Sequence, residues 1–213
     1  MRRLKHAAAG LAGIVVALVV ASQVLPVMTD AHAQEIQPRL ATNPTRLQLF
    51  QGDGTNFMLV NPMYYEIKRT GQTITVPAGF VTDFASVPWY ARWRISVLGK
   101  HSIAAIVHDY LYWEQRCTRE EADAILREAM GEYGSSSADQ MIVYYAVKYG
   151  AQSAWDDNKA DRKKGYVKVL TGAYQNIPLN TDWDSYRQKL FDQKVTEPPI
   201  EPGKPAYCTL PVK

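Results

Sequence analysis

The chain has 213 residues, of which 46% are hydrophobic and 21% charged, and its formal net charge is +3. This is the composition of an ordinary globular protein, so it excludes a disordered chain, a collagen-like repeat and a membrane protein with several spans. The length suits one domain with a tail and is short for two full hydrophobic cores.

Residues 1–33 have the features of a secretory signal peptide. Met1–Lys5 is basic, Leu11–Val20 is densely apolar, and Ala31 and Ala33 are small residues at the positions that a signal peptidase requires. The alternative is an uncleaved anchor, because the uncharged stretch is just long enough to span a bilayer. The short apolar run and Pro26 favour cleavage. We therefore expect a periplasmic or secreted protein without a stable membrane span.

Cleavage after Ala33 changes the charge and the histidine count. It leaves 180 of the 213 residues and removes three basic residues and one acidic residue, so the net charge falls from +3 to +1. With a charge so close to zero, we expect no nucleic-acid partner. Of four histidines only His101 and His108 remain, which excludes Cys/His zinc clusters and sites with three histidines.

Segments rich in β-branched and aromatic residues predict a small antiparallel sheet. They are Arg46–Phe50, Phe57–Ile67 and Gln72–Val76. Turn residues separate them at Gly52–Gly54 and Thr70–Gly71. The next segment, residues 77–89, contains two prolines, a glycine and small polar residues. It is predicted to be a structured loop, without the interior of a helix or a strand.

The following sequence has helical patterns and predicts four helices. They cover Ile103–Trp113, Arg119–Gly131, Ala138–Asp157 and Asp182–Lys194. Thr118 and Glu121 have the spacing of a capping box at the start of the second helix, and Ser136 or Ser137 can cap the third. The stretch 156–164, rich in Lys and Asp, is interpreted as a solvated helix end.

Residues 196–213 include five prolines and are expected to form an extended C-terminal tail. Because the chain is directed to an oxidising compartment, Cys117 and Cys208 predict a disulfide that joins this tail to the domain, worth about 4 kcal/mol. The sequence leaves open whether the bridge forms within one chain or between two. We expect one α+β domain over residues 34–195, a small antiparallel sheet packed against a bundle of three to four helices.

The first predicted helix contains an ionisable pair, His108 and Asp109, in an apolar stretch. Burying such a pair is costly unless partners satisfy it. Tyr112 lies one turn after His108, and Asp123 interrupts the apolar face of the next, antiparallel helix. A carboxylate on one imidazole nitrogen leaves the other to deprotonate water. We therefore expect a catalytic centre of His108, Tyr112 and Asp123, with Asp109 placed to hold a metal or an electrophile.

The predicted loop adds Asp83 and Ser86 to the candidates. Asp83 could bind a metal or orient His101 or His108, and it could equally be a turn or helix-capping residue. Ser86 could complete a triad with His108, but the surrounding sequence lacks the Gly-x-Ser-x-Gly pattern of a nucleophile elbow, so a capping role is favoured.

The alternative to a catalytic centre is a buried His–Asp–Tyr network that only determines how the helices pack. A single histidine on an apolar helix face usually has that role, whereas here several titratable residues converge. Exposure of a His108 ring nitrogen to a pocket would favour catalysis. Complete enclosure of the ring would favour packing.

Several sequence blocks resemble a phage- and bacteria-associated family, domain of unknown function 1353. The blocks are residues 76–88 (VPAGFVTDFASVP), 104–112 (AAIVHDYLY), 118–130 and 144–150. The resemblance covers about residues 45–155. It implies little about activity, because the family is largely uncharacterised.

The pattern His108-Asp109-x-x-Tyr112, followed by Asp123 on an antiparallel helix, is also similar to the two catalytic helices of secreted and viral phospholipases A2. This similarity implies that His108 is the base, that Asp109 binds calcium, and that Tyr112 and Asp123 brace the histidine. The flanking cysteine pairs and the glycine-rich calcium loop of that superfamily are absent, and residues 77–88 stand where the loop is expected. The cofactor therefore stays open, with a divalent metal such as calcium as the candidate.

Together these patterns predict a cell-envelope hydrolase that cleaves an ester or amide in lipid or in peptidoglycan. The alternative is a non-catalytic, phage-derived accessory module of the envelope. In that case the 13 tyrosines and 5 tryptophans of the chain would supply a surface for a partner.

Overall fold

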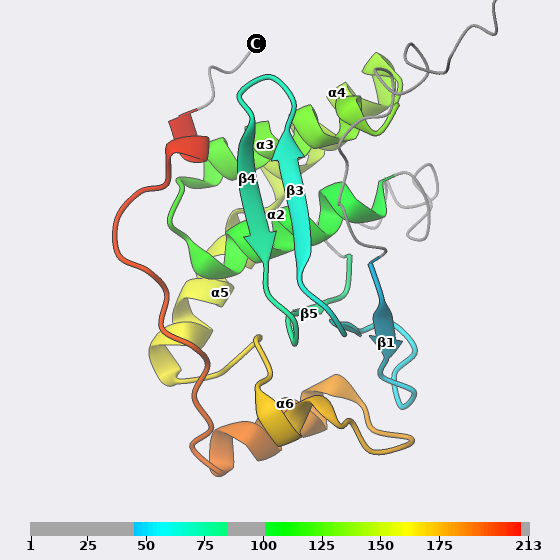
Figure 1. Ribbon diagram of the computed structural model, residues 1–213, viewed down its shortest axis with the longest axis vertical. Helices are drawn as coiled ribbons and strands as arrows, with labels where there is room; N and C mark the ends of the chain where they lie inside the picture. The colour runs from blue at the N-terminus through cyan, green and yellow to red at the C-terminus, as the bar shows by residue number, and fades with distance from the viewer. Residues whose placement is uncertain (1–44, 85–100, 210–213) are drawn as a thin grey trace, which may run out of the picture. The chain divides into compact units, whose positions relative to one another are not determined.

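The computed structural model describes residues 45–84 and 101–209 (Figure 1). The expected signal peptide and Ser86 lie outside these residues. The described chain forms five strands, five α-helices and two short 3-10 helices. The fold is α+β, as the sequence predicts.

The strands form two small antiparallel sheets. The strands are β1 (Leu47–Leu49), β2 (Phe57–Leu59), β3 (Met63–Ile67), β4 (Gln72–Val76) and β5 (Val81–Thr82). One sheet has the order β1-β2-β5, and the other is the hairpin β3-β4. The predicted strand over residues 57–67 is thus two strands, separated at Pro62, which has no N–H for a ladder. Strand β5 lies in the segment that was expected to hold no strand.

The hairpin packs one face against the helices because its side chains alternate. Met63, Tyr65 and Ile67 of β3 are buried, as are Ile74 and Val76 of β4. The intervening threonines of β4 face outward. Helix α2 (Ser102–Glu114) lies behind this hairpin in Figure 1, and it contributes apolar side chains to the same core.

The remaining helices follow α2 in sequence. They are α3 (Arg119–Glu132), α4 (Ser137–Gly150), α5 (Gln152–Lys164) and α6 (Trp183–Asp192), with 3-10 turns η1 (Gly172–Gln175) and η2 (Ala206–Thr209). The predicted capping box is present, since the Thr118 side chain accepts from the N–H of Glu121 and the Glu121 carboxylate accepts from the N–H of Thr118. Ser136 caps α4.

Helices α4 and α5 replace the single helix expected over residues 138–157. The helix is interrupted at Ala151 and a second helix then continues to Lys164, so the whole stretch 156–164 belongs to α5. No residue of α5 is buried. The sequence of this helix therefore lacks the periodic apolar residues from which an amphipathic helix is predicted. It ends at Gly165, whose φ of +99° suits a left-handed cap.

The described residues contain two apolar clusters. The larger lies between the hairpin, α2 and α3 and includes Ile106, Trp113 and Ile125. The smaller joins strands β2 and β5 to α6, and its rings Phe50 and Trp183 meet edge-on at 5.3 Å. Each buried side chain of this size contributes about 1.5–3 kcal/mol.

The C-terminal tail follows α6 and runs along the side of the molecule to η2 (Figure 1). Cys117 and Cys208 form the expected disulfide, and both cysteines belong to the same chain. Next to it, Lys204 of the tail forms an ion pair with Glu121 of α3. Within the part of the chain that the structure describes, no helix has the length and apolarity needed to cross a membrane.

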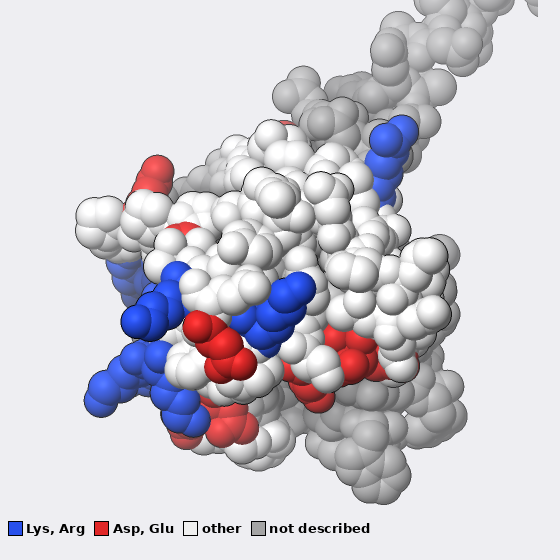
Figure 2. Space-filling view, turned by 90° about the horizontal axis from the view of Figure 1, so that it is seen from below, with Lys and Arg blue, Asp and Glu red and all other residues white. Residues whose placement is uncertain are grey.

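Figure 2 shows the distribution of charge on one face of the molecule. Basic side chains gather on one side of this view, with acidic side chains among them, and much of the remaining face carries no charge. This face therefore mixes the two signs of charge and does not form a continuous basic surface.

Candidate functional site

Helices α2 and α3 bring His108 and Asp123 into direct contact. The Nε2 atom of His108 lies 2.9 Å from Oδ1 of Asp123, and both side chains are buried. The two helices are antiparallel neighbours joined by a short turn, and the Thr118 capping box starts α3 at the end of that turn. The spacing that the sequence analysis used thus corresponds to a contact in the fold.

Asp123 also accepts hydrogen bonds from two other side chains. The hydroxyl of Tyr112 donates to Oδ1 at 2.6 Å, and Nη1 of Arg119 donates to Oδ2 at 3.1 Å. Tyr112 is among the residues predicted from the sequence, whereas Arg119 is not. Its position four residues before Asp123 on the same helix was the signal that could have revealed it.

These contacts determine which ring nitrogen of His108 carries hydrogen in the neutral imidazole. A carboxylate paired with a guanidinium only accepts hydrogen bonds, so Nε2 is the donor to Asp123 and Nδ1 keeps its lone pair. Nδ1 is buried and has no hydrogen-bond partner within residues 45–84 and 101–209. The network therefore leaves one basic nitrogen available.

The network is enclosed. The side chain of His108 has no exposed surface, and that of Asp123 is 1% exposed. Burial, followed by the negative charge of Asp123, raises the pKa of Tyr112 well above its ordinary value, so the phenol remains a neutral donor. By the criterion of ring enclosure, this geometry favours a packing role.

Asp109 points to a different neighbour from His108. Its Oδ2 accepts a hydrogen bond from the Thr82 hydroxyl at 2.5 Å, and the side chain is buried. Burial, then the nearby charge of Asp83, raises the pKa of Asp109 to about 7, although Lys168 and Thr82 oppose the shift. Strand β5 thus places Thr82 and the following Asp83 beside α2. The two predicted metal ligands, Asp83 and Asp109, are therefore neighbours.

His101 lies apart from this centre. It precedes α2, about 10 Å from His108 along the helix axis at 1.5 Å per residue. Its Nδ1 contacts the hydroxyl of Ser135 at 2.7 Å, so His101 joins the start of α2 to the turn after α3. Ser86 lies outside the described residues, and the Ser86–His108 triad cannot be placed.

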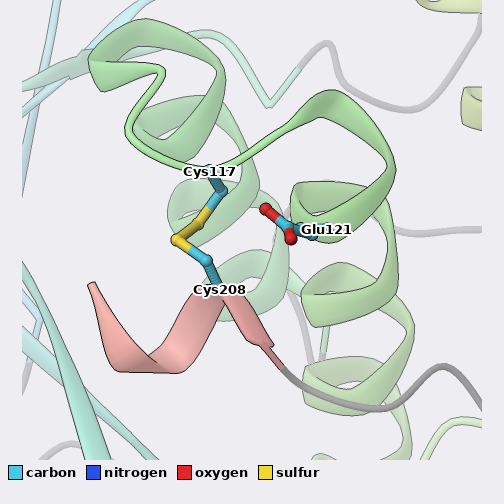
Figure 3. A group of neighbouring side chains, drawn as sticks. All are labelled: Cys117, Glu121 and Cys208. Carbon is cyan, nitrogen blue, oxygen red and sulfur yellow. A yellow bond between two sulfur atoms is a disulfide. The ribbon is translucent and has the colours of Figure 1, made fainter. Parts of the chain in front are cut away.

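The carboxylates of Asp83 and Asp109 do not by themselves make a calcium site. Calcium takes six to eight oxygen ligands, and this pair supplies only two side chains. Among the described residues, the group with metal-like spacing is Cys117, Glu121 and Cys208. Its two sulfurs are joined in the disulfide, with the Glu121 carboxylate beside them (Figure 3), so they are not thiolate ligands.

Residues 57–147 match the family described as "Protein of unknown function (DUF1353)". Over this span the chain resembles the DUF1353 family. The span runs from β2 into α4, so it contains His108, Tyr112 and Asp123 and leaves out the C-terminal tail with Cys208. No curated protein and no solved structure matches the chain.

Proposed function

We propose that this protein is a secreted or periplasmic hydrolase of the cell envelope in which His108 activates water. The observation that carries the proposal is the pairing of a braced Nε2 with a buried Nδ1 that has no partner in the described chain. A histidine held in this way has its basic nitrogen directed and its tautomer set before substrate arrives.

In the proposed reaction, Nδ1 of His108 removes a proton from water as the water oxygen attacks the carbonyl carbon of an ester or amide. The imidazolium is stabilised by Asp123, which Tyr112 and Arg119 hold in place. When the tetrahedral intermediate collapses, the bond to the leaving oxygen or nitrogen breaks and the imidazolium returns the proton to it. The products are a carboxylic acid and an alcohol or amine.

The substrate class follows from the expected export and from the similarity to the two helices of phospholipases A2. The concrete candidates are phospholipid esters and the amide bonds of peptidoglycan. Asp109 follows His108 on α2, and Asp83 lies near enough to raise the pKa of Asp109. The two carboxylates are candidates to bind a divalent cation, but the described residues supply too few ligands for a complete site.

The test is turnover by the secreted protein on phospholipid vesicles and on purified peptidoglycan, each with calcium or with EDTA. We expect His108→Gln to reduce the rate by about 10²–10⁴-fold, the usual contribution of a general base. Glutamine can still donate from its side-chain amide to Asp123, so the helix packing should survive. Asp123→Asn should also lower the rate while leaving the secondary structure in place.

His101→Gln is the matched control, because it changes the other histidine near α2 and leaves the His108–Asp123 contact intact. Full activity in this variant, together with loss in His108→Gln, supports the proposal. Unchanged activity in His108→Gln contradicts it, and so does the absence of turnover on both substrates under both metal conditions.

A second function is favoured by the complete burial of His108. In it the protein is a non-catalytic module of the envelope, and the His108–Asp123 network only joins α2 to α3. This role predicts no turnover with either substrate, and it predicts that His108→Gln and His108→Leu differ in stability alone. Denaturant unfolding of the two variants, measured beside the turnover assay, separates the two functions.

A further inference from the structure

A cavity of about 540 Å³ lies between strand β4, helix α2 and the C-terminal tail. Tyr110 and Glu114 border it from α2, one helical turn apart. At 100° per residue, Tyr110 lies about 200° around the helix from His108, so the cavity occupies the opposite side of α2 from the proposed catalytic centre. Its volume is in the range of small-molecule sites.

Acidic groups outnumber basic groups around this cavity. Glu114, Glu197 and Glu201 border it together with Arg116, so its lining has a net charge of −2 when these groups are ionised. Glu114 is 3% exposed, and Glu201 is exposed at the edge. Negative potential in a partly enclosed space attracts cations and excludes anions.

The two inner carboxylates are held in place by the fold. Glu114 accepts a hydrogen bond from the Tyr207 hydroxyl at 2.8 Å, and Glu197 accepts one from Nε1 of Trp113 at 2.9 Å. Burial raises the pKa of Glu114 despite opposing contributions from Tyr207, Arg116, Tyr110 and Arg162. Burial also raises the pKa of Glu197, despite the N–H groups of residues 168 and 169, the Trp113 indole and Arg162. The surrounding hydrogen-bond donors and cations therefore offset the cost of burying these carboxylates only in part.

Apart from Thr73 and Thr75 of β4, the remaining lining is aromatic and apolar. Tyr110, Trp113 and Tyr207 all border the cavity, as do Val169 and Ile200. Aromatic rings attract organic cations through their quadrupoles, and apolar side chains favour an organic ligand over a hydrated metal ion. The lining thus offers negative charge for an ammonium group and apolar surface for the carbon skeleton that carries it.

We propose that this cavity binds a small alkylammonium compound, with its charged group near Glu114 and Glu201 and its hydrocarbon part against the tyrosine rings. The proposal concerns a different face of α2 from the hydrolase proposal and does not depend on it. All the residues that carry it belong to the described chain.

Three probes of the same ring shape test the role of charge: cyclohexylammonium, neutral cyclohexanol and anionic cyclohexanecarboxylate. Each is titrated into the full protein at pH 7 and followed by NMR. We expect saturable binding of cyclohexylammonium, at least fivefold weaker binding of cyclohexanol, and none of the carboxylate. Equal binding of the neutral probe, preference for the anion, or no saturable binding of the ammonium overturns the proposal.

Two substitutions at the edge of the cavity test its location with effects of opposite sign. Glu201→Gln should weaken cyclohexylammonium binding by about two- to fivefold, and Arg116→Gln should strengthen it by a similar factor, as expected for exposed charges. Glu120→Gln, on the exposed face of α3 and outside the cavity, is the control and should change nothing. Circular dichroism establishes that each variant is folded. If neither substitution changes binding, or if both change it in the same direction, the proposed site is wrong.

Discussion

Glu197 of the C-terminal tail accepts a hydrogen bond from the buried indole of Trp113, which lies 84 residues earlier in the chain. The Nε1 atom is 2.9 Å from Oε1 and 3.0 Å from Oε2 of the carboxylate. The second oxygen also accepts from the N–H groups of Lys168 and Val169. One tail residue therefore satisfies donors from α2 and from the segment after α5, and it lies outside the family-matched span.

This contact predicts that the tail contributes to the stability of the domain. Glu197→Gln replaces one acceptor oxygen by an NH₂ group, which cannot accept from the indole or from the backbone. We expect the free energy of unfolding to fall by about 1–3 kcal/mol, the usual cost of leaving a buried donor unpaired. Urea denaturation measures the change. Glu201→Gln, in the exposed part of the same tail, should fall within about 0.5 kcal/mol of the wild type, and equal effects at the two sites would contradict this assignment.

The Cys117–Cys208 disulfide should add a separate stabilisation. It joins positions 91 residues apart, and closing a loop of this length contributes about 4–5 kcal/mol in the chain-entropy model. The double variant Cys117→Ser/Cys208→Ser should therefore unfold at a much lower urea concentration. A reducing agent should shift the wild type toward the double variant and leave the double variant unchanged. Mass spectrometry verifies that the bridge has been lost. If the unfolding of the wild type is then unchanged by reduction, the predicted stabilisation by the disulfide is contradicted.

The pKa of Asp109 predicts a specific dependence of stability on pH. Because the folded-state pKa is raised to about 7, the unfolded chain, with an ordinary carboxyl near 4, binds fewer protons between these values. The free energy of unfolding should therefore fall as pH rises from about 4 to about 7, by at most about 1.4 kcal/mol per pH unit from this group. Asp109→Asn should remove that contribution while keeping an acceptor for Thr82.

The wild type and Asp109→Asn are compared by urea denaturation at several pH values from 4 to 7, with EDTA present to exclude a bound cation. Burial raises the pKa of Glu114 and Glu197 as well, and these groups act in the same direction in both proteins, so the difference between the two curves isolates Asp109. A difference that stays constant from pH 4 to pH 7 would show that Asp109 titrates normally.

Gly79 occupies a position where a side chain has no room. Its φ is +82°, and an added Cβ would lie 1.9 Å from the carbonyl oxygen of Leu170. The backbone of Gly79 forms hydrogen bonds through both its polar groups. Its N–H donates to the carbonyl of Leu59, and its carbonyl accepts from the N–H of Leu170. We expect Gly79→Ala to cost about 3 kcal/mol or more, because the segments that contain Gly79 and Leu170 must move apart.

Gly54 is the matched control for Gly79. It also has a positive φ, +69°, but an added Cβ would meet nothing within 4 Å. Gly54→Ala should therefore cost only the strain of a left-handed residue, about 1–2 kcal/mol. The excess loss at Gly79, measured by thermal or urea unfolding, reports the collision alone. Equal losses would mean that the close approach to Leu170 does not constrain the fold.

Much of the fold was determined by patterns that act within a few residues. The hairpin around Thr70–Gly71, the capping box at Thr118 and the apolar face of α3 each depend on neighbouring residues, and each appears in the structure as the sequence predicts. The contact of His108 with Asp123 belongs to this group. Two antiparallel helices joined by a short turn have few ways to pair the polar residues that they bury.

Tertiary structure decided what these local patterns could not specify. The division of the strands into two sheets depends on pairing between distant segments. Helix α5, whose sequence has no apolar face, depends on polar bonds to other elements, such as that of Arg162 to the carbonyl of Glu114. Only the fold brings Thr82 to Asp109 and the tail to Trp113. These contacts join residues far apart in sequence, and their energy depends on burial and geometry that arise only once the whole chain has packed.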